Sequence, residues 1–136
     1  MTQANRRVSI GQKMMALAAV LLGVATVVTG LRVLTGWDPG YPVFRPLLIF
    51  NTAMGPVYLA AGVTAWRSVP MGKRAAGAIV VLNAVVLGAV VVLHSADLGV
   101  AVDSVRAMVF RTVVWLLLFL GLAWLGRRSL GADRVT

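Results

Sequence analysis

The sequence predicts an all-α fold, a four-transmembrane-helix up-down-up-down bundle. Hydrophobic residues make up 60% of the 136 residues and charged residues only 12%, which is about half the charged fraction of a typical soluble domain. The mean hydropathy is +0.90. The apolar residues form long blocks, and a bilayer core about 30 Å thick needs roughly 20 apolar residues per helix. Four blocks meet this length, at about residues 14–34, 44–66, 75–94 and 107–125.

The first block follows three basic residues, Arg6, Arg7 and Lys13. It is longer than the apolar region of a signal peptide, which has about 7–15 residues, and no A-x-A cleavage site follows it. We therefore expect a membrane helix and not a cleaved leader. Ala19 and Gly23 lie four residues apart, a spacing of small residues that lets a neighbouring helix approach closely.

The second block follows a connector, residues 36–42, which combines proline, glycine and aspartate with aromatic residues suited to a membrane interface. Within the block, Gly55-Pro56 removes one backbone donor and predicts a local kink or loosening.

The third block follows residues 69–72, whose proline and glycine predict a break in the chain. It carries a second pair of small residues, Ala84 and Gly88. The connector to the fourth block runs from about residue 95 to 106, and residues 103–106 fit the first turn of the last helix. Short connectors favour antiparallel neighbouring helices.

Positive charge is distributed unequally between the two ends of the predicted bundle. The net charge of +9 arises from 13 Lys and Arg against 4 Asp. Arg32, Arg45, Arg106 and Arg111 flank the connectors on one side. The other side carries nine basic residues, namely Arg6, Arg7, Lys13, Arg67, Lys73, Arg74, Arg127, Arg128 and Arg134. Because cytoplasmic segments retain positive charge, we expect a multi-pass protein of the bacterial cytoplasmic (inner) membrane with both termini in the cytoplasm.

Composition also limits the chemistry. The chain has no cysteine and a single histidine, which excludes disulfides, thiolate nucleophiles, iron–sulfur clusters and cysteine zinc sites, and excludes a haem with two axial histidines from one subunit. The basic residues lie at the ends of apolar blocks, so we expect membrane lipid as their partner and no nucleic acid. No catalytic motif is present, and we expect neither an enzyme nor a cofactor.

Polar residues inside apolar blocks are informative because each is costly unless it has a partner. Helical spacing places one polar stripe on each block, and stripes turned inward would form a polar seam that opens outward, on the side opposite the termini. The candidate seam residues are Arg32, Asn51, Tyr58, Asn83, His94, Asp97, Asp103, Arg106, Arg111 and Trp115.

Each seam residue also has a structural interpretation. Arg111 either extends to the interface or pairs with Asp103 or Asp97. Asp103 and Arg106 are three residues apart and fit a surface ion pair at a helix start, worth less than about 1 kcal/mol. Asparagines in membrane helices usually form hydrogen bonds between helices, and we favour this role for Asn51 and Asn83. We also favour a structural role for His94.

The runs from Asn51 to Gly62 (NTAMGPVYLAAG) and from Arg106 to Trp115 (RAMVFRTVVW) resemble a family of small bacterial four-helix integral membrane proteins without an assigned activity. In that family a glutamate is expected just before the arginine of the last helix, where this chain has Val102-Asp103-Ser104-Val105. The resemblance implies the four-helix fold and a role for four polar residues, Asn51, Tyr58, His94 and Arg111. It implies no chemistry.

Three functions fit these features. The first is a non-enzymatic accessory, assembly or scaffold subunit, bound to other membrane-protein subunits or to itself, which the short connectors and small-residue helix faces favour. The second is a small homo-oligomeric transporter or channel, in which His94 would couple to protons, although the inner half of the seam is nearly all apolar. The third is a binder of a lipid or a quinone-like ligand, with Arg32, Arg45 and Arg111 around an outward pocket.

Overall fold

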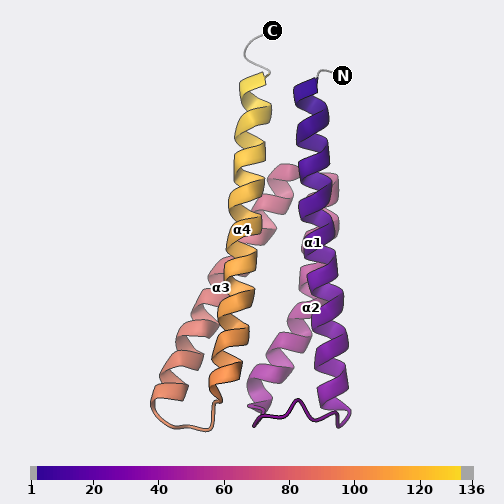
Figure 1. The fold of residues 1–136 in the computed structure, drawn as a ribbon. Helices are drawn as coiled ribbons and strands as arrows, with labels where there is room; N and C mark the ends of the chain where they lie inside the picture. Colours follow the sequence, from indigo (N-terminus) through magenta and orange to yellow (C-terminus); the bar gives the residue numbers. More distant parts are fainter. Residues whose placement is uncertain (1–2, 133–136) are drawn as a thin grey trace.

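The computed structural model describes residues 3–132, and this range forms four α-helices without a β-strand. The helices, shown in Figure 1, are α1 (Gln3–Leu34), α2 (Arg45–Arg67), α3 (Val69–Ser95) and α4 (Val102–Ala132). Each contains a segment long and apolar enough to cross a membrane. The predicted all-α fold with four apolar helices is therefore confirmed.

The helices extend beyond the apolar blocks that hydropathy delimits. Helix α1 begins at Gln3, eleven residues before the predicted start at residue 14, and α4 ends at Ala132 instead of residue 125. With a rise of 1.5 Å per residue, the 32 residues of α1 span about 48 Å and the 23 residues of α2 about 35 Å. In Figure 1 the terminal ends of α1 and α4 consequently project past the turn between α2 and α3.

The turn between α2 and α3 is much tighter than predicted. Residues 69–72 were expected to break the chain, but Ser68 is the one non-helical residue between the two helices. Pro70 lies in the first turn of α3, where a missing N–H breaks no hydrogen bond. A Cβ on Gly72 would lie 2.5 Å from the Cα of Ala65, so glycine is required for this close approach.

Helices α1 and α2 pack with their backbones in near contact. A Cβ on Gly23 would lie 2.9 Å from the backbone nitrogen of Leu59 and 3.1 Å from the carbonyl oxygen of Gly55. Ala19 is buried in the same interface, so the small pair on α1 has the packing role that its spacing predicts. Helix α2 also stays helical through Pro56.

The second pair of small residues has no such contact. Ala84 and Gly88 on α3 are both exposed, and no atom of the described chain lies within 4 Å of a Cβ built on Gly88. The pair faces outward, away from the other helices of the bundle. Helical spacing identifies small residues on one face, but it does not say which face of the helix the rest of the chain covers.

Side chains complete the ends of the helices. The Gln12 side-chain nitrogen, from α1, donates hydrogen bonds to the carbonyl oxygens of Ala65 (2.8 Å) and Trp66 (3.1 Å). These carbonyls belong to the last turn of α2, whose C=O groups have no partner within the helix. Gln12 therefore ties α1 to the end of α2 in addition to the backbone packing.

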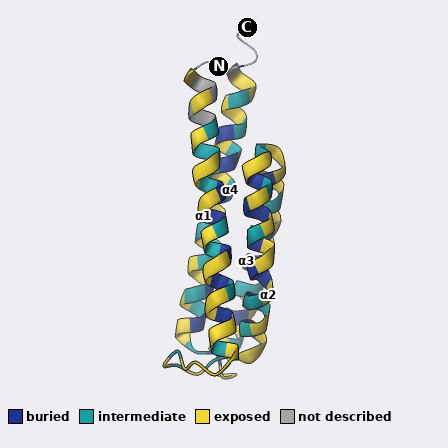
Figure 2. Ribbon diagram, turned by 90° about the vertical axis from the view of Figure 1, so that its right-hand side faces the viewer, coloured by how far each residue is buried: buried dark blue, intermediate teal, exposed yellow. Residues whose placement is uncertain are grey.

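Buried residues line the faces on which the helices meet (Figure 2). One apolar cluster joins all four helices along the end that carries the termini and includes Ala16, Ala61, Ala76 and Leu122. A smaller cluster near the opposite end contains Leu47, Val90, Val100 and Met108. The polar residues considered next lie where these clusters meet.

Cation–aromatic pairs occur at both ends of the bundle. Lys13 lies 5.7 Å from the ring centroid of Trp66, and the Arg128 guanidinium lies 3.7 Å from that of Trp124. At the other end the Arg32 guanidinium lies 5.3 Å from the ring of Trp37. Tryptophan and basic side chains gather at membrane–water interfaces. The 22 residues of α2 from position 45 to 66 span about 32 Å, close to the thickness of a bilayer core.

Candidate functional site

Three helices contribute one polar aromatic or amide side chain each to the centre of the bundle. Tyr58 of α2, Asn83 of α3 and Trp115 of α4, here called the buried triad, are 0%, 0% and 1% exposed. The Tyr58 hydroxyl donates a 3.2 Å hydrogen bond to Oδ1 of Asn83. The rings of Tyr58 and Trp115 have centroids 4.8 Å apart and planes tilted by 44°. The triad therefore links α2, α3 and α4 through one hydrogen bond and one aromatic contact.

Two N–H groups of the triad remain without a partner among residues 3–132, namely Nδ2 of Asn83 and Nε1 of Trp115. A buried polar group without a partner costs about 1–3 kcal/mol. The triad thus offers hydrogen-bond donors, and the chemistry that its side chains suit best is interhelical hydrogen bonding.

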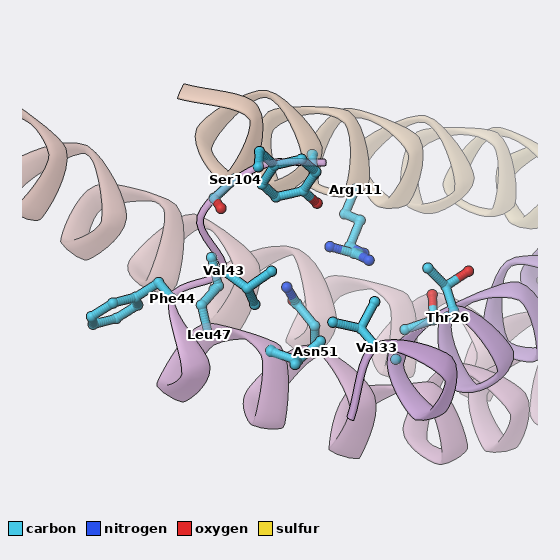
Figure 3. Close-up of a pocket in the computed structure, with 13 residues that line it drawn as sticks. Thr26, Val33, Val43, Phe44, Leu47, Asn51, Ser104 and Arg111 are labelled. Carbon is cyan, nitrogen blue, oxygen red and sulfur yellow. The ribbon is translucent and has the colours of Figure 1, made fainter. Parts of the chain in front are cut away.

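A pocket lies between α1, α2, α4 and the α1–α2 connector, toward the end opposite the termini. Its cavity volume is about 80 Å³. We call it the Arg111 pocket. Its lining, drawn in Figure 3, consists of Thr26, Thr29, Gly30, Val33, Tyr41, Val43, Phe44, Leu47, Leu48, Asn51, Ser104, Ala107 and Arg111.

Two nitrogen-bearing side chains point into this pocket from facing helices. Figure 3 shows the guanidinium of Arg111 and the amide nitrogen of Asn51 directed into the same space. Oδ1 of Asn51 is buried and has no hydrogen-bond partner within the described chain. The lining contains one cation and no acidic residue. The one ion pair among the described residues joins Asp103 and Arg106, so Arg111 makes no salt bridge to a described residue.

Hydroxyl groups of the pocket lack the hydrogen bonds that hydroxyls elsewhere in the helices make. Thr52 and Thr112 each donate to the backbone carbonyl four residues earlier, at 2.8 Å. Thr26, Thr29 and Ser104 line the pocket, and none of their side chains makes a hydrogen bond to another described residue. Tyr41 also lines the pocket, so four hydroxyls are available to a molecule there.

An open groove continues from the pocket along the outer side of α1 and α4. This α1–α4 groove has a volume of about 190 Å³ and is lined by Leu22, Ala25, Thr26, Thr29, Ala107, Phe110 and Arg111. Four of these residues, Thr26, Thr29, Ala107 and Arg111, also line the pocket. Leu22 precedes Thr29 by seven residues, so the groove extends about 10 Å toward the middle of α1.

The other predicted seam residues lie at the surface. His94 is at the end of α3, where Nδ1 lies 2.7 Å from the Val100 carbonyl oxygen; because a carbonyl only accepts, Nδ1 carries the proton in this bond. Asp97 is exposed in the connector with φ 56°. Arg32 is exposed and lies over a tryptophan ring, as described above.

Asp103 and Arg106 form the surface ion pair that their spacing predicts. The carboxylate and guanidinium are 3.6 Å apart, and the Arg106 and Asp103 side chains are 77% and 49% exposed. Exposed pairs of this kind contribute less than about 1 kcal/mol. The structure therefore brings Asn51 and Arg111 together in the pocket and Tyr58, Asn83 and Trp115 in the triad, and it separates both groups from these surface charges.

Thr26 and Tyr41 line the pocket but were absent from the predicted seam. The one residue of the first helix among the predicted seam residues is Arg32, which is exposed. The buried face of α1 instead contains Ala16, Ala19, Gly23, Thr26 and Gly30. These small residues repeat at intervals of three and four, a signal from which Thr26 was predictable.

The described residues contain no group of three or more His, Cys, Asp or Glu side chains that could hold a metal ion. The pocket's polar groups are instead a guanidinium, an amide and hydroxyls, which suit the binding of an anion. Comparisons of the chain with protein families, with curated proteins and with solved structures find no match.

Proposed function

We propose that this chain is a multi-pass protein of the bacterial cytoplasmic (inner) membrane, with its helices in up-down-up-down order and both termini in the cytoplasm. The start of α1 and the end of α4 lie at the same end of the bundle, which supports this order (Figure 1). The same end carries Arg67, Lys73 and Arg74 around the turn between α2 and α3. Segments rich in basic residues are retained in the cytoplasm.

Single cysteines test this topology without background, because the chain has none of its own. Leu98→Cys places a thiol in the α3–α4 connector and Leu130→Cys places one near the end of α4; both positions are exposed. A membrane-impermeant maleimide added to intact cells should label the first and not the second. Labelling of Leu130→Cys before lysis would refute the proposed orientation.

Within that membrane, we propose a non-enzymatic role as an accessory, assembly or scaffold subunit that associates with other membrane proteins or with copies of itself. The observation that supports this proposal is the exposed glycine at position 88 of α3. Glycine inside a helix costs up to about 1 kcal/mol relative to alanine. Gly23, Gly55 and Gly72 each allow a close contact within the bundle, whereas Gly88 has no neighbour within 4 Å in the described chain.

Gly88 belongs to an outward surface of α3 that we call the α3 face, formed by Val81, Ala84, Val85, Gly88 and Val92, all exposed. Small residues four apart allow helices to associate in lipid, where the hydrophobic effect provides no driving force between them. A helix that packs against Ala84 and Gly88 would occupy the space that the absence of a side chain at Gly88 leaves open. No atom of residues 3–132 occupies that space.

Gentle purification of the full chain, with mass measurement of the particle, tests this role. The wild type should be recovered in fixed stoichiometry with a partner or a second copy. Gly88→Leu should remain folded, because its position is open, and should lose that association. Ala18→Leu places the same side chain at an exposed position on α1 and should keep it. Recovery of the wild type as a partnerless monomer would count decisively against the proposal.

The transporter or channel alternative receives less support from the geometry. Between the buried triad and the terminal end, the core is built from apolar residues such as Ala16, Ala61, Ala76 and Leu122. His94, the residue expected to couple protons, is engaged with the Val100 carbonyl. Vesicles containing the protein should show no proton or solute flux; a flux abolished by His94→Ala or Arg111→Ala would restore this alternative.

A further inference from the structure

We infer that the Arg111 pocket binds the phosphate group of an anionic membrane phospholipid, with the lipid's acyl chain lying in the α1–α4 groove. This site goes beyond the proposed subunit role and does not depend on it. Three observations carry the inference: an unpaired cation, a set of unused hydrogen-bonding groups, and an apolar groove that begins at the same residues.

The positive charge of Arg111 in the pocket favours an anionic ligand. Arg111 is nine residues into α4, about 14 Å along the helix, and arginine is rare and costly within membrane-spanning segments unless it has a partner. No acidic residue lines the pocket, and the one described ion pair, between Asp103 and Arg106, leaves Arg111 out. An anionic ligand would supply the counter-charge that the described chain does not.

The hydrogen-bonding groups fit a phosphate better than a neutral ligand. A guanidinium presents five N–H donors in a planar fork that matches phosphate oxygens. The amide nitrogen of Asn51 points into the same space (Figure 3), and the hydroxyls of Thr26, Thr29 and Ser104 are free of bonds to described residues. A phosphate offers several acceptor oxygens to such a set of donors.

The groove distinguishes a lipid from a free anion. Thr26, Thr29, Ala107 and Arg111 line both the pocket and the groove, so a molecule held at Arg111 has a direct path along α1 and α4. Beyond these shared residues the groove is lined by Leu22, Ala25 and Phe110. Inorganic phosphate would leave this apolar part uncovered, whereas an acyl chain would cover it. The occupant that matches both parts has an anionic head and a hydrocarbon tail.

Native mass spectrometry of the purified full chain tests the inference. The protein is incubated with phosphatidylglycerol, with phosphatidylcholine, or with phosphatidylglycerol plus millimolar inorganic phosphate. We expect phosphatidylglycerol to be retained about tenfold more than phosphatidylcholine, and inorganic phosphate not to displace it. Equal retention of the two lipids would overturn the inference. Displacement by inorganic phosphate would show a free-anion site and would also overturn it.

Arg111→Gln removes the charge of the pocket while keeping an amide donor, and should lower phosphatidylglycerol retention about tenfold, the loss of roughly one charge-assisted hydrogen bond. Arg106→Gln is the matched control, because Arg106 lies on the same helix outside the pocket and its side chain is 77% exposed. It should bind as the wild type does. Equal behaviour of the two variants would refute the role of Arg111.

A second pair of variants decides the question if Arg111→Gln does not fold. Ala107 lies where the pocket and the groove meet, so Ala107→Phe should block the lipid's path while leaving Arg111 in place. Val109→Phe adds the same ring at an exposed position of α4 that lines neither cavity, and should bind normally. A folded Ala107→Phe variant that retains phosphatidylglycerol as the wild type does would overturn the proposed lipid path.

Discussion

Replacing Gly23 by alanine should destabilise the bundle by pushing α1 away from α2. The added Cβ would lie 2.9 Å from the backbone nitrogen of Leu59 and 3.1 Å from the carbonyl oxygen of Gly55. Both neighbours are backbone atoms of a helix, so no side-chain rotation can relieve the contact. The two helices must separate by a few tenths of an ångström along their closest approach.

The size of the effect follows from two opposing contributions. Overpacking a well-packed interface costs about 1–3 kcal/mol, while alanine is intrinsically better than glycine in a helix by up to about 1 kcal/mol. Gly88→Ala provides the control, since it has the same gain in helix propensity and no atom within 4 Å of the new Cβ. The difference between the two variants therefore isolates the packing contribution, and we expect Gly23→Ala to be less stable by about 1–3 kcal/mol.

Reversible unfolding in mixed detergent micelles, followed by tryptophan fluorescence, measures both free energies of unfolding under one condition. The control should be as stable as the wild type or slightly more stable. If Gly23→Ala and Gly88→Ala had the same stability within error, the close packing of α1 on α2 would be wrong. A third variant, Gly23→Leu, should prevent folding altogether because its side chain is larger.

Three further predictions use the same unfolding assay. Tyr58→Phe keeps the aromatic ring and removes the hydroxyl that donates to Asn83. It should lower the free energy of unfolding by about 0.6 kcal/mol and at most about 1.7 kcal/mol, as for other hydrogen bonds in membranes. A double-mutant cycle with Asn83→Leu should give the same coupling energy, and additive losses would contradict the hydrogen bond. Gln12→Ala removes the donor to two carbonyls at the end of α2 and should lower the free energy of unfolding by about 1 kcal/mol. An unchanged free energy would show that Gln12 does not stabilise this helix end. Asp103→Asn breaks only the exposed pair with Arg106 and should change stability by less than about 0.5 kcal/mol; a loss above about 1 kcal/mol would indicate a buried role.

The four helices were predictable because long apolar segments cannot remain in water, and their number follows from counting such blocks. Their ends were less predictable. Hydropathy follows the lipid-facing residues, so it missed the polar turns by which α1 begins at Gln3 and α4 continues to Ala132. The proline and glycine of residues 69–72 predicted a break in the chain, because proline usually ends a helix, whereas Pro70 here lies in the first turn of one.

The sequence predicted which polar residues stand out, but it predicted less well which of them lie together in one site. Asn51, Asn83 and Arg111 stood out because a polar side chain is costly in an apolar helix. Which of them meet depends on the rotation of each helix about its axis, which the tertiary packing decides. The hydrogen bond between Tyr58 and Asn83 joins two helices whose relative rotation no local pattern specifies. Thr26 is an exception, because the small residues at intervals of three and four mark the buried face of α1 on which it lies.

The single non-helical residue between α2 and α3 has a mechanical consequence. With Ser68 alone connecting the two helices and Gly72 seated against Ala65, the backbones of α2 and α3 lie in close contact at this end of the molecule. A small change in the angle between α2 and α3 displaces atoms least at Ser68 and most at the far ends of the 23-residue α2 and the 27-residue α3, about 35–40 Å away. The Arg111 pocket is lined by residues of α4 and by none of α3, so such a change would reach the pocket only through α4, which packs against α3.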